Sequence, residues 1–189
     1  MNEGNDAFVV AFTVADALES AGLPYAIGGA HAYNLYSVPR ATKDVDLNVF
    51  VDGTRLDQLL TTLHRAGVMF DDDEARRGHA DGGYFVGHLG AVRVDVFTPS
   101  IPYSWEAGLT RRRAQLDGRE HWYLSAEATA LFKLLFFRGK DVVDLERLVA
   151  TQQEKLDHVY VRRWIVEMMG EDDPRTKTWD DLVARFGHS

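Results

Sequence analysis

Two acidic residues one position apart, Asp44 and Asp46, are the side chains of this sequence best suited to chemistry. Apolar and polar residues alternate over 44–51, so both carboxylates lie on one face of a predicted strand, with Cα atoms about 6.5–7 Å apart. Without a cation the two charges would repel by about 3 kcal/mol at ~5 Å and an effective dielectric of about 20. Mg²⁺, which carboxylates hold together with substrate phosphates, removes that repulsion. The pattern indicates a divalent-metal site, with a solvated polar strand face as the simpler interpretation.

A glycine pair, Gly28-Gly29, joins a predicted apolar strand at 25–27 to a short helix at 30–36. Glycine has no Cβ, so backbone N–H groups there can approach a ligand closely. The helix N-terminus behind the pair supplies unpaired donors and partial positive charge, which suit phosphate. Pro39 ends this helix. Taken alone, the pair is also explained by a plain tight turn.

A third carboxylate, Asp95, lies between valines in a strand predicted at 91–97. We expect this strand to follow one at 83–88 through a tight turn and to pair beside 44–51. A lone acid there is costly unless a cation or a hydrogen-bond donor meets it. Asp95 is therefore the candidate for a third carboxylate of the site, with an edge-strand surface acid as the alternative.

One lysine, Lys133, stands in the middle of an otherwise apolar helix that Ser125 is expected to cap. Burying an ammonium group requires an anion nearby, or a stem that reaches water. Lys140 and Asp144 follow seven and eleven positions later and share its face on one continuous helix, although a glycine between them can break it. Either Lys133 points at a triphosphate with Lys140 and Asp141 or Asp144 beside it, or Lys140 and Asp144 form an ion pair.

The run Gly28-Gly29, then Pro39-Arg40-Ala-Thr42-Lys-Asp44-Val-Asp46, resembles the motif of the nucleotidyltransferase (polymerase beta-like) superfamily. The resemblance implies an α/β (α+β) nucleotidyltransferase fold, in which helices flank a mixed sheet and a C-terminal helical bundle follows. It implies an enzyme that binds an NTP on the glycine turn, aided by Arg40, Thr42 and Lys133. It also implies two Mg²⁺ ions on three acids, of which the last helps to deprotonate the attacking hydroxyl: Asp44, Asp46 and Asp95.

A second signature, Lys133…Arg138-Gly-Lys140-Asp141-Val-Val-Asp144-Leu145, is similar to that of the AbiEii/MenT-type nucleotidyltransferase toxins. This resemblance implies that Lys133 is catalytic and that three further residues bind the nucleotide: Lys140, Asp141 and Asp144. It implies a toxin that transfers NMP, with CTP as the favoured donor, to the 3′ end of tRNA and so blocks translation. The implied partner is a cognate antitoxin, and we expect a kinase-like inhibitor to act by phosphorylating Thr42 or Ser37, since added negative charge beside the acids would block nucleotide entry.

Two alternative functions stay open. In the first, the enzyme transfers NMP to a hydroxyl of an aminoglycoside or lincosamide antibiotic, because the net charge of −8 would attract a cationic drug. In the other, the chain is a non-catalytic binding or regulatory module with the same fold, which three acids in place make a weaker interpretation. Protection from an antibiotic would favour the first, and an Asp46→Ala variant without phenotype would favour the second.

The composition sets limits on the class of protein. The 189 residues, 46% hydrophobic, suit one compact domain or a core with a small appendage, and without cysteine neither a disulfide nor a thiolate metal site forms. The acidic charge argues against a surface that binds nucleic acid throughout, but arginines and lysines could form a local basic lip: Arg111, Arg112, Arg113, Arg119, Arg138, Lys140, Arg162 and Arg163. The first residues carry no basic signal region and no apolar run spans a membrane, so we expect a cytoplasmic protein.

The remaining elements must position these residues. We expect a nucleotidyltransferase core at 1–124 and a helical region at 125–189 that completes the active site. Asn5 or Asp6 is expected to cap a first helix through Ala21, and a second helix to run over 54–65. The acidic, glycine-containing stretch 71–83 predicts a loop. A short strand at 68–70, a helix or irregular crossover at 103–113, a strand at 119–124 and helices at 156–169 and 179–186 complete the prediction.

Overall fold

The computed structural model describes residues 6–187, and in this range the chain divides into two compact units. The first, which we call the sheet unit, contains the described residues up to His31 together with Ala41–Leu124. The second, the helical unit, contains Ala32–Arg40 and the described residues from Ser125 onward. The chain thus leaves the sheet unit within one helix, α2 (Gly29–Tyr36), and contributes residues 32–40 to the helical unit.

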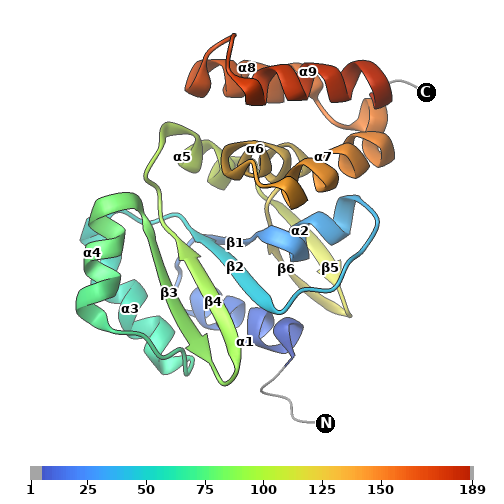
Figure 1. The fold of residues 1–189 in the computed structure, drawn as a ribbon. Coiled ribbons are helices and arrows are strands. Elements are labelled where there is room, and N and C mark those ends of the chain that lie inside the picture. Colours follow the sequence, from blue (N-terminus) through green and yellow to red (C-terminus); the bar gives the residue numbers. More distant parts are fainter. Residues whose placement is uncertain (1–5, 188–189) are drawn as a thin grey trace. The chain divides into compact units, whose positions relative to one another are not determined.

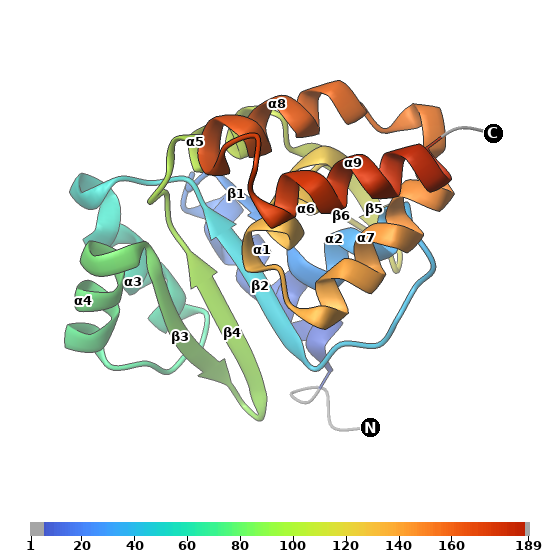
Figure 2. The same cartoon turned by 45° about the horizontal axis from the view of Figure 1, so that its top comes forward.

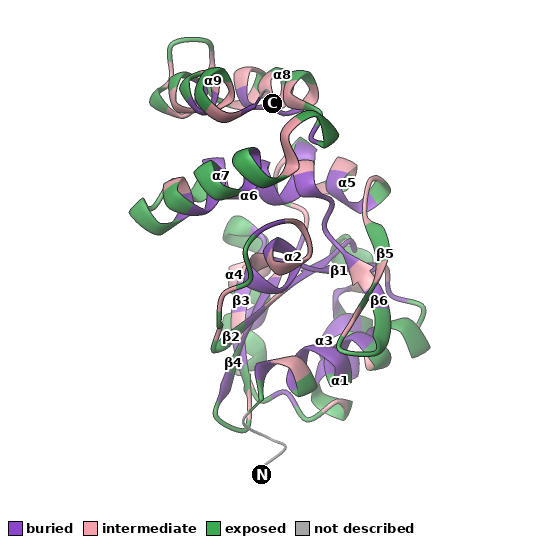
Figure 3. Ribbon diagram, turned by 90° about the vertical axis from the view of Figure 1, so that its right-hand side faces the viewer, coloured by how far each residue is buried: buried purple, intermediate pink, exposed green. Residues whose placement is uncertain are grey.

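Within residues 6–187, six strands of the sheet unit form one mixed sheet, in the order β3-β4-β2-β1-β6-β5 (Figure 1). The strands are β1 (Tyr25–Ile27), β2 (Asp44–Val49), β3 (Tyr84–Leu89), β4 (Val92–Phe97), β5 (Arg112–Leu116) and β6 (Arg119–Tyr123). β2 and β4 run parallel, as do β1 and β6, and the other neighbours are antiparallel. The central strand β1 is buried throughout and β2 for most of its length, as the colouring of Figure 3 shows. The mixed sheet with flanking helices confirms the predicted fold class.

Helices of the sheet unit are α1 (Ala7–Ser20), α3 (Leu56–Arg65), α4 (Asp72–Gly82) and α5 (Pro102–Leu109), with a 3₁₀ turn η2 (Gly53–Arg55) before α3. α1 begins where the Asp6 carboxylate accepts the Phe8 N–H at 2.8 Å, as expected of a capping aspartate. Asn5, the alternative cap, lies outside the described residues. The buried stripe of α1 packs on β1 and β2 and supports the strands that carry the glycine pair and the acids.

The predicted loop at 71–83 was wrong, because α4 occupies Asp72–Gly82. Asp71 caps α4 by accepting the Glu74 N–H at 2.8 Å. The acids of the first turn stabilise the helix through their attraction to the positive end of its dipole. Gly78 sits inside the helix because a Cβ there would lie 2.2 Å from the Tyr84 carbonyl oxygen. Gly83 ends the helix in the left-handed conformation, at φ 66°. The acids and glycines that suggested a loop are therefore caps and a close-packing site.

The helical unit contains α6 (Ala126–Phe136), α7 (Gly139–Gln152), a 3₁₀ turn η3 (Gln153–Lys155), α8 (His158–Met169) and α9 (Pro174–Phe186). α6 begins at Ser125, whose hydroxyl accepts the Ala128 N–H at 3.1 Å, as predicted. The helices pack on one another through α6, α7, α8 and α9 (Figure 1). Among the described residues, none of the helices is both long and apolar enough to span a membrane.

Other expectations differ from the structure. The strand β5 (Arg112–Leu116) was not predicted, and α9 begins at Pro174 instead of residue 179. The predicted strand at 68–70 is a single bridge between Met69 and His88. The crossover after the core strands contains α5, which Pro102 begins. The helix that Ser125 caps ends at Phe136, because Phe137 adopts a left-handed conformation with φ 50°. That break separates α6 from α7, so Lys133 and Asp144 belong to two helices and not to one.

Candidate functional site

The strands β2 and β4 lie side by side in the sheet (Figure 2), and their parallel pairing brings the three predicted acids to one face of the sheet unit. Asp46 pairs with Asp95, and Asp44 pairs with Arg93. Paired residues of neighbouring strands lie about 4.8 Å apart and point to the same face, and residues two apart on a strand share that face. Asp44, Asp46 and Asp95 therefore form what we call the carboxylate face, on which Arg93 forms an ion pair with Asp95.

Asp95 is buried, and two donors meet one of its oxygens. The Tyr84 hydroxyl donates to Asp95 Oδ1 at 2.6 Å and Arg93 Nε donates to the same oxygen at 2.9 Å. Arg93 Nη2 also donates to the Tyr84 hydroxyl oxygen at 2.7 Å. Burial raises the pKa of Tyr84, and its hydrogen bond to Asp95 raises it further; the hydrogen bond to Asp95 likewise raises the pKa of Arg93. The cost of burying this acid is met by a hydroxyl and a guanidinium, neither of which was assigned a role from the sequence.

Asp46 packs against the glycine turn. Its backbone carbonyl accepts the Gly28 N–H at 2.8 Å, and a Cβ added to Gly29 would lie 1.8 Å from Asp46 Oδ2. Gly29 has φ +54°, a conformation that L side chains rarely adopt. A Cβ on Gly28 would lie 2.6 Å from Asn48 Nδ2. The pair is therefore required by close approach to β2, whatever ligand it also admits.

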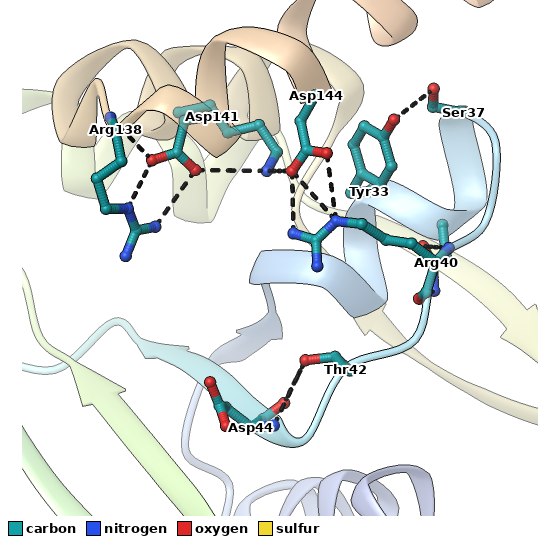
Figure 4. A network of polar contacts seen from close by, with 10 residues as sticks. Tyr33, Ser37, Arg40, Thr42, Asp44, Arg138, Asp141 and Asp144 are labelled. Carbon is teal, nitrogen blue, oxygen red and sulfur yellow. Dashed lines mark hydrogen bonds and ion pairs between the residues drawn. The ribbon is translucent and has the colours of Figure 1, made fainter.

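Asp44 is exposed at the start of β2. The Thr42 hydroxyl accepts the Asp44 N–H at 3.4 Å and lies 3.2 Å from the Asp44 carbonyl oxygen, to which it can donate (Figure 4). Thr42 thus closes the loop that leads into the strand. The Asp44 carboxylate has no hydrogen bond or ion pair with any residue between 6 and 187, which leaves it available to a ligand.

The carboxylate face has the donor chemistry that Mg²⁺ prefers, since all its acids offer hard oxygen atoms. In the described part of the chain, however, no three His, Cys, Asp or Glu side chains are already gathered closely enough to hold an ion. Arg93 and Tyr84 both occupy Asp95 Oδ1, and its Oδ2 has no partner among residues 6–187. The acids therefore fit a divalent cation by type and register, with Asp95 Oδ2 and the Asp44 carboxylate as the accessible donors.

In the helical unit, Lys133 of α6 is buried and is paired with two acids of α7, Asp141 and Asp144, which Figure 4 labels. Its Nζ donates to Asp144 Oδ2 at 2.6 Å and lies 3.8 Å from Asp141 Oδ1. Asp141 also accepts Arg138 Nε at 2.6 Å. The expected alternative, a pair between Lys140 and Asp144, was wrong: Lys140 is exposed, and the break at Phe137 lets Asp144 meet Lys133 instead.

Arg40 joins the same group of charges, although 104 positions separate it from Asp144. Arg40 Nη2 donates to Asp144 Oδ2 at 2.9 Å and Nε donates at 3.2 Å to Oδ1. Asn34 fixes the Arg40 backbone, accepting its N–H at 3.0 Å and donating to its carbonyl oxygen at 2.9 Å. Burial would raise the pKa of Asp144, but the hydrogen bonds from Arg40 and Lys133 outweigh it and hold that pKa below its usual value.

Tyr33, which the sequence analysis did not single out, lies beside both cations. Its ring centroid is 5.0 Å from Lys133 Nζ and 5.7 Å from the Arg40 guanidinium carbon, within the range of cation–π attraction. The buried Ser37 hydroxyl donates to the Tyr33 hydroxyl oxygen at 3.0 Å. We call this set the ion network: Tyr33, Arg40, Lys133, Arg138, Asp141 and Asp144. Its cations outnumber its carboxylates by one.

Most arginines of the expected basic lip are neutralised by acids. In the sheet unit Arg113 pairs with Glu19 and Glu120, and Arg119 pairs with Asp16. In the helical unit Arg162 pairs with Glu171 and Asp180. These pairs leave little free positive charge for phosphate contacts at those positions.

The sheet unit also contains a cavity of about 320 Å³ around the end of α4, lined by residues that include Asp52, Gly53, His79, Asp81, Gly83 and Trp105. These residues follow the C-terminal ends of β2 and β4, belong to α4 and α5 or, in the case of Gly83, end α4, whereas Asp44 begins β2. None of the predicted site residues lines this cavity.

No protein-family model matches the chain, and no curated protein matches it. Solved structures do. A nucleotidyltransferase-like antigenic protein from Paracoccidioides brasiliensis matches with a TM-score of 0.53 at 20% identity, over 92% of this chain and 93% of that one. The lincomycin-bound lincosamide adenylyltransferase LnuA gives 0.52 at 15% identity, over 76% and 97%. The antibiotic-resistance factor ANT(2'')-Ia gives 0.50 at 19% identity, over 94% and 89%. The chain has a nucleotidyltransferase fold. At these identities the comparison shows the fold alone, and the substrate must be inferred from the site residues.

Proposed function

We propose that the protein is an Mg²⁺-dependent nucleotidyltransferase, which transfers NMP from an NTP to an acceptor hydroxyl. The observation that carries the proposal is the register of β2 and β4, which sets Asp46 opposite Asp95 with Asp44 on the same face. The glycine turn touches the Asp46 carboxylate, so a phosphate-binding backbone and the acids belong to one small region of the sheet unit. The nucleotidyltransferase fold supports the same reaction class by analogy.

In this reaction the acceptor oxygen bonds to the α-phosphorus, the bond from that phosphorus to the α–β bridging oxygen breaks, and pyrophosphate leaves. Asp44, Asp46 and Asp95 would hold the two expected Mg²⁺ ions. Bound Mg²⁺ supplies charge neutralisation at the phosphate oxygens. Asp95 would take the hydroxyl proton at Oδ2, because Oδ1 is already engaged by Tyr84 and Arg93.

In the helical unit, the surplus positive charge of the ion network favours binding of phosphate. Arg40 is the best candidate, since its side chain is 32% exposed and its Nη1 has no partner among residues 6–187. Lys133 contributes charge while Asp144 holds it in place. Lys140 is exposed and without an ion pair in the described structure, so it stays a candidate contact to nucleotide or acceptor.

For the acceptor we propose the 3′ end of tRNA, which would make the protein a translation-blocking toxin controlled by an antitoxin. The support is the Lys133…Asp144 signature, whose two ends are in direct contact at 2.6 Å. A hydroxyl of a cationic antibiotic is the second candidate, favoured by the fold shared with LnuA and ANT(2'')-Ia and by the net charge of −8.

Label transfer tests the reaction and separates the acceptors. The purified chain with Mg²⁺ and each α-labelled NTP in turn is incubated with total tRNA, with tRNA whose 3′ terminus has been oxidised by periodate, and with aminoglycosides and lincosamides. We expect label on intact tRNA only. If only an antibiotic is labelled, the acceptor is the antibiotic and not tRNA. If no acceptor is labelled, the proposed nucleotidyltransferase activity is overturned.

The variants Asp46→Asn and Asp81→Asn are matched, because both remove one carboxylate from the sheet unit and Asp81 is exposed on α4. We expect Asp46→Asn to lower the rate by about 1,000-fold, since loss of about 4 kcal/mol of transition-state stabilisation has that effect. Asp81→Asn should retain the wild-type rate. Equal rates for the two variants would favour a contaminating activity or a non-catalytic module.

We also propose that an antitoxin kinase would act on Thr42 in preference to Ser37. Thr42 is half-buried in a loop, whereas Ser37 is 9% exposed and donates its hydroxyl proton to Tyr33. A phosphate on Thr42 would add about −1.5 to −2 charges beside Asp44. Intact-mass analysis of wild type and Thr42→Val, each co-expressed with the neighbouring gene, should show the added phosphate on wild type only.

A further inference from the structure

Tyr84, Arg93 and Asp95 form a closed triangle of hydrogen bonds on β3 and β4. Tyr84 and Arg93 both donate to Asp95 Oδ1, at 2.6 and 2.9 Å, and Arg93 donates to Tyr84 at 2.7 Å. Tyr84 pairs with Phe97 and Val86 pairs with Asp95, so the tyrosine reaches the acid diagonally across the antiparallel pair. Its ring packs on Phe97 with centroids 4.9 Å apart, which fixes the hydroxyl over β4.

The triangle restricts the carboxylate of Asp95. The terminal torsion of an aspartate is broad and roughly two-fold, so a free carboxylate exchanges its oxygens and tilts easily. Hydrogen bonds to a charged group contribute about 1.5–3 kcal/mol each, and here both end on the same oxygen of a side chain that is 9% exposed. Oδ1 is therefore held, and Oδ2 is the oxygen left for a ligand.

We propose that Tyr84 and Arg93 are positioning residues, which hold Asp95 by Oδ1 so that Oδ2 is presented to the metal and to the acceptor proton. The inference rests on the proposed function, since it takes Asp95 as a metal ligand. In this proposal the edge strand β3 has a specific role, because it supplies the Tyr84 hydroxyl that holds Asp95 of β4. Partners of this kind around metal ligands change affinity about 10–100-fold when they are removed.

Tyr84→Phe is the cleaner variant for the test. It removes the hydroxyl without changing charge, whereas removal of Arg93 also removes a positive charge that opposes a divalent cation. Arg93 is 48% exposed in its side chain, so water can replace the lost tyrosine oxygen. Tyr123→Phe is the matched control: Tyr123 lies on β6 of the same sheet, is buried, and its hydroxyl has no partner in the described residues.

The measurement is Mn²⁺ binding to the full chain, followed by the electron paramagnetic resonance signal of free Mn²⁺, together with thermal unfolding. We expect Tyr84→Phe to weaken Mn²⁺ binding about 10-fold and Tyr123→Phe to leave it unchanged. Arg93→Lys, which retains the charge but not the fork that joins Asp95 to Tyr84, should also weaken it. A lower melting temperature of Tyr84→Phe with unchanged Mn²⁺ affinity would overturn the proposal, since that result assigns the triangle to stability alone.

Asp95→Asn separates this proposal from the one on which it rests. If wild type binds no Mn²⁺, or Asp95→Asn binds it as wild type does, the metal site of the proposed function fails. If Asp95→Asn loses binding while Tyr84→Phe retains it, the metal site stands and only the positioning role is overturned.

Discussion

The carboxylate face of the sheet unit and the ion network of the helical unit treat charge in opposite ways. On the carboxylate face, Asp95 is paired with Arg93, and the Asp44 carboxylate has no protein partner among the described residues. In the ion network, Lys133, Asp141 and Asp144 are all buried and each meets an opposite charge within 4 Å. Asp44 thus carries an unpaired negative charge near solvent, whereas the charges of Lys133, Asp141 and Asp144 are paired in the interior.

This difference indicates different tasks. Buried charges must be paired, because an ion without its partner in the interior costs several kcal/mol, so removal of the partner of Lys133, Asp141 or Asp144 should lower stability. Asp44 is exposed and has no protein partner among the described residues, so it contributes little to stability. Its carboxylate is available to a ligand, whereas the ion network holds Lys133 and Arg40 in place.

The largest difference in the free energy of unfolding is expected between Asp144→Asn in the ion network and Asp44→Asn on the carboxylate face. Asp144→Asn leaves Lys133 buried without its closest anion and should lower the free energy of unfolding by about 3 kcal/mol. Asp44→Asn, at an exposed position, should change it by less than about 0.5 kcal/mol. Urea unfolding of both variants and wild type measures the difference, and equal costs would contradict the assignment of the ion network to stability.

The same pair of variants has a pH signature. Because the pKa of Asp144 in the folded protein is below its ordinary value of 3.8, its contribution to stability is complete above that value and is lost as the pH falls through the lower folded value. The stability gap between Asp144→Asn and wild type should therefore be constant near neutrality and close in acid below pH 3.8.

A smaller effect is expected at His31, a buried group of the sheet unit that avoids charge instead of pairing it. Its two ring nitrogens lack hydrogen-bond partners in the described structure and its ring lies edge-on to Phe8, with centroids 4.8 Å apart. Burial lowers the pKa of His31 from 6.5 to about 4. The unfolded chain then takes up the proton first, so stability should fall by up to about 3 kcal/mol as the pH drops from 6.5 to about 4.

Removal of the imidazole should abolish this pH dependence. The free energy of unfolding of His31→Leu, measured in urea from pH 7 to pH 4, should lack the slope that wild type shows, and His88→Gln at an exposed position of β3 should keep it. A wild-type slope in His31→Leu would show that other groups bind the protons.

The smallest effect on stability, and the most local, is expected from Gly29→Ala against Gly22→Ala. Both glycines have positive φ, +54° and +65°, so both variants should lose about 1 kcal/mol through backbone strain. A Cβ at Gly22 has no heavy atom within 4 Å, whereas at Gly29 it would lie 1.8 Å from Asp46 Oδ2. Rotation can move Oδ2 away, but the added Cβ would also lie 2.9 Å from Asp46 Cβ, which rotation does not move, so Gly29→Ala should be slightly less stable than Gly22→Ala.

The two variants should therefore differ little in melting temperature and chiefly in metal binding. Mn²⁺ titration should show weaker binding for Gly29→Ala and the wild-type affinity for Gly22→Ala. Equal affinities would show that the present position of the Asp46 carboxylate is not the one that binds metal.

Local patterns predicted much of the framework. Period-two alternation placed Asp44 and Asp46 on one strand face, and β1 and β2 start at the expected residues. Local pattern misled at 71–83, where acids and glycines that usually indicate a loop instead cap α4 and allow Gly78 to pack closely on Tyr84. Tyr84 lies on β3, outside the stretch 71–83, so the close contact that requires Gly78 could not be inferred from that stretch alone.

The sequence alone determined which residues could do chemistry: the glycine turn, the acid pair on an alternating strand, a third acid among valines and a lysine in an apolar helix. Tertiary structure decided their partners. Strand register sets Asp46 opposite Asp95, and the turn at Phe137 directs Lys133 to Asp144. Arg40 reaches Asp144 across 104 positions. Such pairings depend on how whole elements bury their apolar faces, which is a property of the folded chain and not of any local spacing.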